Sequence, residues 1–363
     1  MPEEEVIRVR RLTRWQRIGV AVLLVIGALI LGSVIFVLSG VYNIAASRDH
    51  WSVTNFAITV LRDRSIATAS SAIEVPPLDD PDLYRLGEQH VMGACSTCHG
   101  RPGRPLNPLY THMTPSPPDL TGAMAHYSAN EVFWIVSHGL KYTGMPAWPG
   151  SGRPDEVWSV VSYLDRLNGR PEIGANMSEE KIAAAQSFES CARCHGGEGT
   201  APVSALVPRL EGLSEPYIAR ALAEYRSGIR ASGFMAPVAH DMSEGEIEAF
   251  ARYYSGLTVP RQDEPLRADD IAAGRQIAET GVAEDDVPAC DSCHGGVNPQ
   301  IPELRGQSAR YLATQLKLWR NGGYRDASAQ GRIMAVIGRR LGEAEAEAVS
   351  TYYAAQATDG GAP

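Results

Sequence analysis

Three copies of the pattern Cys-x-x-Cys-His constrain this 363-residue chain more than any other feature. The copies begin at Cys95, Cys191 and Cys290, so their spacings are 96 and 99 residues. Together they use all six cysteines of the chain and leave no thiol for a disulfide bond. We therefore expect three copies of one domain-sized unit, each built around its own pattern.

The Cys-x-x-Cys-His pattern is the attachment signature of c-type haem. On a helical turn, thiols three residues apart share a face, and both can form thioether bonds to one porphyrin. The histidine that follows lies under the iron as an axial ligand. The sequence therefore predicts three covalently attached haem c groups, held by Cys95, Cys98 and His99, by Cys191, Cys194 and His195, and by Cys290, Cys293 and His294.

A zinc site or a redox-active dithiol is the alternative for such a pattern. Zinc ribbons complete their tetrahedral site with a second pair of ligands. Each pattern here offers one pair and an adjacent histidine, too close in sequence to complete a tetrahedron, and three half-sites do not pair off evenly. The ligand count favours haem.

An uncharged apolar segment of 24 residues, 18–41, precedes all three patterns. About 20 such residues span a bilayer, and the segment is longer than the roughly 7–15 residues of a signal-peptide core. It predicts a single-pass anchor in a bacterial inner membrane; a signal cleaved near residues 44–46 is the alternative. The arginines before it predict a cytoplasmic N-terminus and a periplasmic remainder: Arg8, Arg10, Arg11, Arg14 and Arg17.

The net charge of −9 is unevenly divided, because residues 1–17 carry +2 and the rest of the chain carries −11. An acidic body does not suit nucleic acid as a partner. It suits docking to a basic protein surface, although solubility alone would also explain it.

The expected organisation is a tail and anchor at residues 1–47, a connector at 48–78 and three repeats. In the connector, residues 51–61 predict a short helix and residues 67–77 a linker. The first repeat is residues 79–170, the second is 171–260 and the third is 261–358, with boundaries near Arg170-Pro171 and Val259-Pro260. Each repeat is small for a self-sufficient core, so a buried porphyrin would supply its missing apolar centre.

A methionine in each repeat is expected to be the second axial ligand. The third repeat has one methionine after its pattern, Met334, and no histidine beyond His294. Met334 lies 44 residues after Cys290, and Met235 lies 44 residues after Cys191. Sulfur ligation of haem iron by methionine is well known, so both are predicted ligands.

A helix that follows each methionine supports the same assignment in all three repeats. From Met145, Met235 and Met334, steps of 12, 15, 16 and 19 residues reach one face of an amphipathic helix, and a tyrosine falls at step 18 each time. Each repeat therefore predicts a helix with the haem pattern, a loop with the methionine and a closing helix. Ser243 and Glu246 predict a capping box before the second closing helix.

Other methionines and histidines compete for the axial position. Most methionines are core filler, and a lone histidine is usually structural. The competitors are Met113, Met124, His112, His126 and His138 in the first repeat, and Met242 and His240 in the second. We expect the six remaining histidines to be structural: His50, His90, His112, His126, His138 and His240.

These residues give the chain a family likeness. Residues 171–358 resemble the di-haem cytochrome c4 family, through residues 191–197, 208–212 and 235–254 in the second repeat and 287–296 and 306–312 in the third. The first repeat resembles single-haem class I cytochrome c modules, in which residues 144–148, Gly-Met-Pro-Ala-Trp, present the axial methionine; residues 117–120 and 138–143 share that likeness. The resemblance implies an all-α chain of three tandem class I cytochrome c domains after one transmembrane helix. It also implies electron shuttling, commonly to a terminal haem-copper oxidase.

Methionine–histidine ligation leaves no open position on iron, which favours electron transfer over chemistry on a substrate. The sequence shows no nucleophile–base constellation and no small-molecule site, so we expect a carrier and not an enzyme. The leading hypothesis is a membrane-tethered wire from a quinol-oxidising complex or soluble cytochrome to a terminal oxidase. Alternatives are a cytochrome subunit of a periplasmic dehydrogenase and, third, a haem peroxidase, which would need one displaceable iron ligand.

Overall fold

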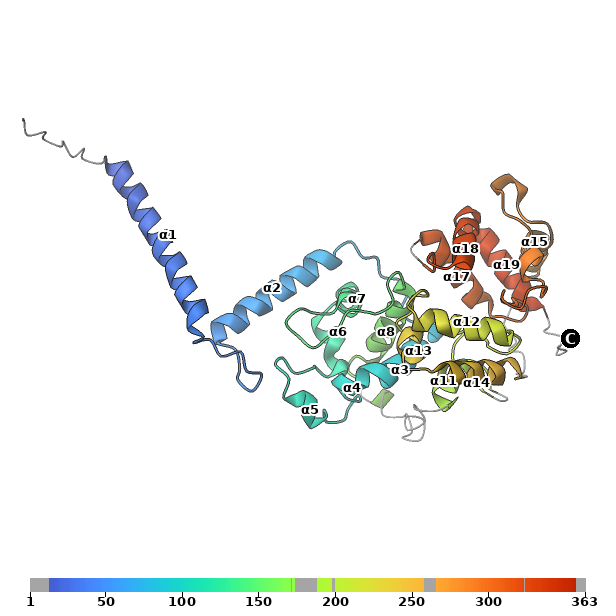
Figure 1. Ribbon diagram of the computed structural model, residues 1–363, viewed down its shortest axis with the longest axis horizontal. Helices are drawn as coiled ribbons and strands as arrows, with labels where there is room; N and C mark the ends of the chain where they lie inside the picture. The colour runs from blue at the N-terminus through green and yellow to red at the C-terminus, as the bar shows by residue number, and fades with distance from the viewer. Residues whose placement is uncertain are drawn as a thin grey trace, which may run out of the picture. The chain divides into compact units, whose positions relative to one another are not determined.

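A computed structural model describes residues 13–170, 172–173, 188–197, 200–257, 266–322 and 324–356. This part of the chain is all-α and contains no β-strand (Figure 1). Two isolated bridges, Gly197–Thr200 and Val282–Val287, are its only strand-like pairings. The expected all-α class is confirmed. The predicted boundary residues Pro171, Val259 and Pro260 lie outside the described residues, as do Arg8, Arg10 and Arg11.

The chain divides into two compact units, residues 1–55 and 56–363. The first unit contains α1 (Arg14–Ser39), which begins four residues before the predicted anchor segment and ends two residues before its end. The Thr13 hydroxyl accepts a hydrogen bond from the Gln16 amide, the Gln16 side chain accepts one from the Thr13 amide, and Gly40 ends the helix at φ +63°. The apolar side chains of α1 are exposed along its length.

Helix α2 (Ser52–Ser70) is longer than the predicted helix at residues 51–61. The linker predicted from residue 67 is therefore wrong for residues 67–70, which continue the helix. Two contacts hold its second half in place: the Tyr127 hydroxyl donates to Asp63 Oδ1 at 3.1 Å, and the Asn130 amide donates to the carbonyl oxygen of Ser70 at 3.0 Å.

The first repeat pairs the helix before its haem pattern with its closing helix. Its elements are α3 (Pro81–His90), the π-helical turn η1 (Val91–Cys95), α4 (Ser96–His99), α5 (Pro108–Thr111), η2 (Leu120–Gly122), α6 (Ala123–His126), α7 (Ala129–His138) and α8 (Pro154–Leu167). Helix α3 begins with Asp80 as N-cap and Pro81 at the first position, a favoured combination. It packs along α8, in which the predicted apolar face is buried: Val157, Val160, Val161 and Leu164. Tyr163, at step 18, is buried as well.

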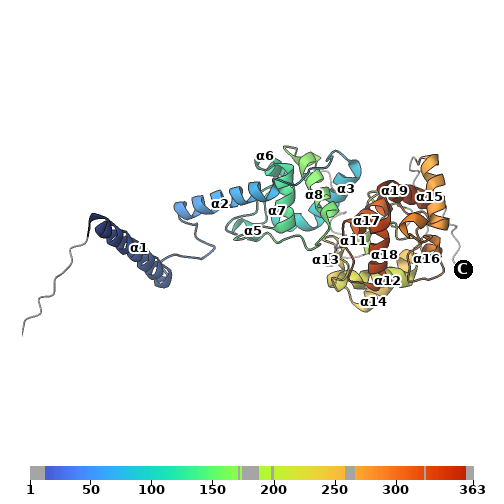
Figure 2. The same cartoon turned by 90° about the horizontal axis from the view of Figure 1, so that it is seen from above.

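The second repeat has a smaller described core. Its elements are α11 (Phe188–His195), α12 (Glu215–Arg226), α13 (Met235–His240) and α14 (Glu244–Ser255). Helix α12 packs against α13 and α14, and the two longer helices lie close together in Figure 2. The capping box predicted from Ser243 and Glu246 is confirmed. Tyr217, Ala251 and Tyr254 lie in the core between these helices.

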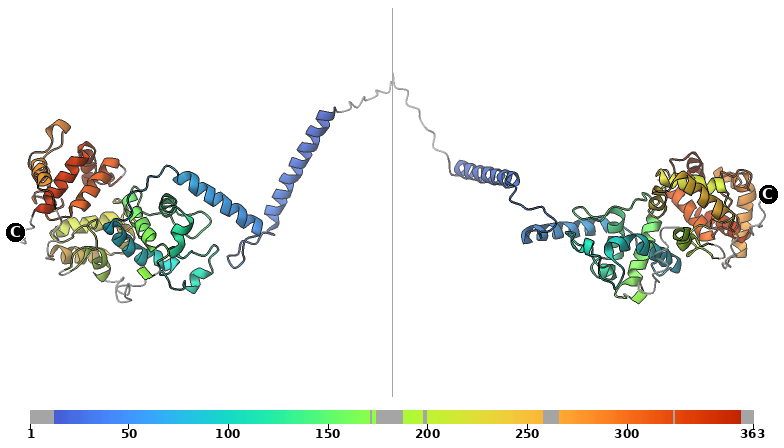
Figure 3. Two further views of the ribbon diagram at one scale, coloured as in Figure 1. Left: turned by 180° about the vertical axis from the view of Figure 1, so that it is seen from behind. Right: turned by 60° about the horizontal axis from the view of Figure 1, so that its bottom comes forward.

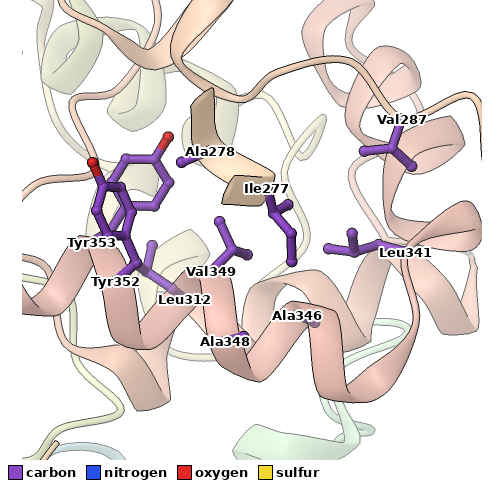
Figure 4. Close-up of a cluster of buried hydrophobic side chains, with 10 residues drawn as sticks. All are labelled: Ile277, Ala278, Val287, Leu312, Leu341, Ala346, Ala348, Val349, Tyr352 and Tyr353. Carbon is purple, nitrogen blue, oxygen red and sulfur yellow. The ribbon is translucent and has the colours of Figure 1, made fainter. Parts of the chain in front are cut away.

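The third repeat repeats the pairing of the first. Its elements are α15 (Ala268–Thr280), η4 (Ala283–Asp285), α16 (Asp291–His294), α17 (Ala309–Asn321), α18 (Ala329–Arg340) and α19 (Glu343–Ala355). They lie together, coloured orange to red, in both views of Figure 3. Helix α15 packs on α19, and the cluster between them includes Ile277, Val349 and Tyr353 (Figure 4).

The methionines differ in their local structure. Met145 lies on the loop between α7 and α8, where Gly144 and Pro146 do not favour a helix. Met235 is the first residue of α13, and Met334 lies in the middle of α18. The expectation of a loop is therefore correct for Met145 and wrong for the other two. The helix of residues 329–340 is capped at its start by the Ser328 hydroxyl, which accepts a hydrogen bond from the Gly331 amide.

The three repeats meet at the start of α3. Arg310 of α17 donates to the Asp80 and Asp82 carboxylates. From the second repeat, the Ser204 hydroxyl donates to the carbonyl oxygen of Asp82 at 3.0 Å, and the Ala205 amide donates to Asp82 Oδ1 at 3.0 Å. The first turn of α3 therefore joins all three repeats.

Candidate haem sites

The histidines of the three patterns share one hydrogen bond. Nδ1 of His99, His195 and His294 donates to a proline carbonyl oxygen at 2.9, 3.0 and 2.8 Å, respectively. Because a carbonyl oxygen can only accept, Nδ1 must carry the proton in each ring. Nε2 is then unprotonated and available to a metal, the arrangement that second-shell hydrogen bonds give to ligating histidines.

The proline partners, Pro118, Pro208 and Pro302, were not assigned this role from the sequence. They follow their histidines by 19, 13 and 8 residues, so no constant spacing reveals them. The sequence feature that could have identified them is the Pro-x-Leu segment, which begins at each of these prolines. Its leucine packs in the core of its own repeat, which holds the proline carbonyl over the ring: Leu120, Leu210 and Leu304.

The six cysteines are partly buried, except for exposed Cys293, and none forms a disulfide bond. The first cysteine of each pattern packs against its own core: Cys95, Cys191 and Cys290. Burial raises the pKa of the Cys95 and Cys290 thiols to about 11. Burial also lowers the pKa of His195 and His294, which keeps both rings neutral. Such apolar surroundings suit a porphyrin edge.

One cavity of about 830 Å³ collects the predicted ligands of two repeats. Its volume lies within the range of cofactor sites, about 300–1,000 Å³. Its lining includes both predicted sets in full: Cys191, Cys194, His195 and Met235, and Cys290, Cys293, His294 and Met334. Cys95, Cys98, His99 and Met145 do not line it, so the first set lies apart.

The competing residues fall into different places. Met124 packs against the core of the first repeat, and His240 has a side chain that is 76% exposed. Met242 lines the shared cavity together with Met235. The terminal methyl group of Met113 lies against Gly144, next to Met145. The structure therefore separates His240 from the sites, whereas Met124 packs against the same core as Cys95, and Met242 and Met113 lie near predicted ligands.

Buried arginines give the cavity a positive wall. Arg193, Arg230 and Arg325 line it, and the Nε atom of each is buried without a hydrogen-bond partner among the described residues. Arg230 is 4% exposed and stacks on the ring of Tyr225 at 4.5 Å. Donor atoms that are buried without a partner favour a group that can accept hydrogen bonds, such as a carboxylate. A haem carries two propionates, so the residues fit this cofactor.

No cluster of three or more His, Cys, Asp and Glu side chains that would hold a bare metal ion is present in the part of the chain that the structure describes. Each pattern histidine instead has its own cysteine pair and proline carbonyl. The sites offer the ligands of a covalently held porphyrin three times.

Known proteins are similar to parts of this chain. The family of cytochrome c oxidase, cbb3-type, subunit III matches residues 82–164. A thiosulfate dehydrogenase electron acceptor from Thiomonas intermedia is 36% identical over 179 residues, which are 48% of this chain and 82% of that protein. Cytochrome c4 from Pseudomonas aeruginosa is 28% identical over 49% of this chain and 89% of its own length. The solved cytochrome c4 structure from Acidithiobacillus ferrooxidans, 28% identical, covers 46% of this chain and 99% of its own, with a TM-score of 0.42.

Proposed function

This chain belongs to the c-type cytochromes and resembles cytochrome c4, and from that premise we propose that it is a membrane-tethered electron carrier with three covalent haem c groups. It is an electron-transfer protein and not an enzyme. When bound, haem c supplies a one-electron ferric–ferrous couple. The chain's own residues hold the porphyrin, fix the axial ligands and exclude water.

The repeated histidine geometry is the observation that carries the proposal. In each repeat the proline carbonyl fixes the proton on Nδ1 and orients the ring, so that His99, His195 and His294 present Nε2 to iron. Met145, Met235 and Met334 supply the sixth ligand. The cysteine pairs Cys95 and Cys98, Cys191 and Cys194, and Cys290 and Cys293 form the thioether bonds.

Helix α1 is the proposed anchor. Its length and composition suit a membrane span, and none of its residues is buried in the protein. Arg14 and Arg17 at its start favour a cytoplasmic N-terminus, and periplasmic haem repeats are part of the proposal.

The family match of the first repeat supports a terminal haem-copper oxidase as the electron acceptor, because residues 82–164 match an oxidase subunit family. Electrons would enter from a quinol-oxidising complex or a soluble cytochrome. The second candidate function is acceptor for a periplasmic dehydrogenase. The similarity to a thiosulfate dehydrogenase electron acceptor favours it, with a thiosulfate-oxidising enzyme as the donor.

The cofactor proposal is tested on the full chain purified in detergent. A pyridine haemochrome assay should give three haems per chain, and the weak long-wavelength band of ferric iron–methionine ligation should be present. Met145→Ala, Met235→Ala and Met334→Ala should each open one haem to carbon monoxide, whereas Met124→Ala should open none. Two haems per chain, or a high-spin ferric haem in the unaltered protein, would contradict the proposal.

The partners are tested by rapid mixing. The reduced protein is mixed with a haem-copper oxidase, and the oxidised protein with thiosulfate and thiosulfate dehydrogenase. Fast oxidation in the first experiment supports the leading function, and fast reduction in the second supports the other candidate. Failure of both reactions would rule out both partner assignments.

A further inference from the structure

A buried carboxylate, Glu156, lies at the start of α8 and is 2% exposed. Each of its two oxygens has two donors. Oε1 accepts from the Ser232 hydroxyl at 2.5 Å and pairs with the Arg153 guanidinium at 2.8 Å. Oε2 accepts from the Gly233 amide at 2.6 Å and from the Trp148 indole N–H at 3.1 Å. Burial raises the pKa of Glu156, and the Arg153 guanidinium and the donors from Ser232 and Gly233 act against that rise and favour the carboxylate.

The donors of Glu156 come from the two chain segments that carry the first two axial methionines. Trp148 lies three residues after Met145, and Ser232 and Gly233 lie immediately before Phe234 and Met235. These segments belong to different repeats and are more than 80 residues apart. Glu156 therefore bridges the methionine segments of the first and second repeats.

On the second-repeat side, the connection reaches the ligand itself. The Ser232 hydroxyl that donates to Glu156 also accepts from the backbone amide of Met235 at 2.9 Å. Arg153, the ion-pair partner of Glu156, donates to the carbonyl oxygen of Ala231 at 3.2 Å. One hydrogen-bonded atom, Ser232 Oγ, separates the carboxylate from the main chain of Met235.

On the first-repeat side, Trp148 fixes the end of the Met145 loop. Its amide donates to the carbonyl oxygen of Ser137 at 3.1 Å, and the Leu140 amide donates to that of Met145 at 3.2 Å. Its ring packs against Phe234 with centroids 5.6 Å apart. A shift of the Trp148 indole would displace the Met145 loop and Phe234, which is the residue next to Met235.

We propose that Glu156 is a positioning residue shared by the axial methionines of the first and second repeats, because its hydrogen bonds hold the Met145 and Met235 segments together and do not include the Met334 segment. This inference rests on the proposed haem ligation. A buried ion pair seldom adds net stability over an apolar packing of the same volume. Its role here is to fix the two segments in one geometry.

Replacing the Glu156 carboxylate with an amide breaks part of the hydrogen-bond network that connects the two methionine segments. Glutamine has one acceptor oxygen and one NH2 group. In Glu156→Gln the NH2 group therefore faces either Arg153 and Ser232 or the N–H groups of Gly233 and Trp148. Both orientations lose the ion pair and at least one of the bonds that lead to Met145 and Met235. The substitution also removes a buried negative charge, which should raise the reduction potentials of the haems around it.

The readout is the set of upfield-shifted methyl resonances of iron-bound methionines in the NMR spectrum of the reduced protein. The single variants Met145→Leu, Met235→Leu and Met334→Leu assign the three resonances. We expect Glu156→Gln to shift or broaden the Met145 and Met235 resonances and to leave that of Met334 in place. Redox titration should show raised potentials, because a buried negative charge is lost.

Two further variants sharpen the test. Asp165→Asn makes the same charge change on the exposed side of α8 and should leave all three resonances unchanged. Ser232→Ala removes the link to Met235 and should shift that resonance more than the Met145 resonance. A response of one methionine alone to Glu156→Gln, or of none, would overturn the inference. Absence of methyl resonances in the unaltered protein would instead overturn the proposed ligation.

Discussion

Gly87 in α3 lies against the carbonyl oxygen of Ser159 in α8, so closely that a Cβ atom on Gly87 would come well within 3.0 Å of it. Gly274 in α15 and Ala348 in α19 have the same relationship. Ser159 follows Met145 by 14 residues, and Ala348 follows Met334 by 14 residues. The helix crossing is therefore repeated in register in the first and third repeats.

Gly87→Ala and Gly274→Ala should each destabilise the protein by about 1–3 kcal/mol, because the added methyl group must push two packed helices apart. Thermal unfolding of the full chain measures the loss. The control is Gly245→Ala in α14, where nothing lies within 4 Å of the added atom. That change should leave stability equal or raise it by up to about 1 kcal/mol. Equal unfolding midpoints for Gly87→Ala and Gly245→Ala would show that α3 and α8 do not pack closely at Gly87.

His90 should make stability depend on pH. Burial, and secondarily the Arg193 guanidinium, lowers the pKa of His90 to about 4 from an ordinary 6.5. The unfolded chain therefore binds a proton below pH 6.5 that the folded chain takes up only near pH 4. The free energy of unfolding is therefore unaffected by His90 protonation above pH 6.5, and it decreases progressively as the pH falls to about 4.

The measurement is the unfolding midpoint of the unaltered protein minus that of His90→Phe, taken from pH 8 to pH 4. Phenylalanine keeps an aromatic ring beside Trp148 and Phe234, which lie 4.8 and 4.5 Å from His90 between ring centroids. The difference should be constant above pH 7 and should fall below pH 6.5. A flat difference would contradict the depressed pKa.

Arg230→Gln should lower the reduction potentials of the haems in the second and third repeats. A buried cation beside a haem disfavours the extra positive charge of the ferric state, so its removal stabilises that state. Redox titration checks the shift. Arg332→Gln, on an exposed position of α18, is the matched control and should leave the potentials unchanged. If Arg230→Gln and Arg332→Gln have the same reduction potentials, Arg230 does not interact with the haems.

Arg310→Ala should weaken the junction of the three repeats by at most about 1 kcal/mol at low salt, because Arg310 is 42% exposed and its pairs with Asp80 and Asp82 are partly screened. Raising the salt concentration should shrink this loss. Lys317→Ala, exposed on the same helix, serves as the comparison. An effect of Arg310→Ala that is independent of salt would mean that packing, and not charge, dominates there.

The sequence predicted the closing helices well because their apolar faces follow the helical period. Val157, Val160 and Leu164 are buried as the steps from Met145 required, and Ala346, Val349 and Tyr353 are buried as the steps from Met334 required. In the second repeat, Phe250 on the same face is only partly buried, and Tyr253, which lies outside that face at step 18, is 39% exposed. The haem patterns were equally clear, because their chemistry depends on adjacent residues.

Contacts between distant segments could not be predicted in the same way. The Pro118, Pro208 and Pro302 carbonyls lie at three different separations from their histidines, because the intervening loops differ in length. Glu156 looks like an ordinary first-turn acid of α8 until the structure places Ser232 and Gly233 around it. The likeness among the repeats predicts a loop at Met334, whereas residues 329–340 form helix α18 there.

The cavity shared by the second and third repeats has a consequence for biogenesis. Because one space contains both ligand sets, a chain that has received only one of the two porphyrins retains a large unfilled volume beside the other. Unfilled apolar space is costly, so maturation of these two repeats should behave as one cooperative event. Half-loaded intermediates would then be the species most exposed to proteolysis during assembly.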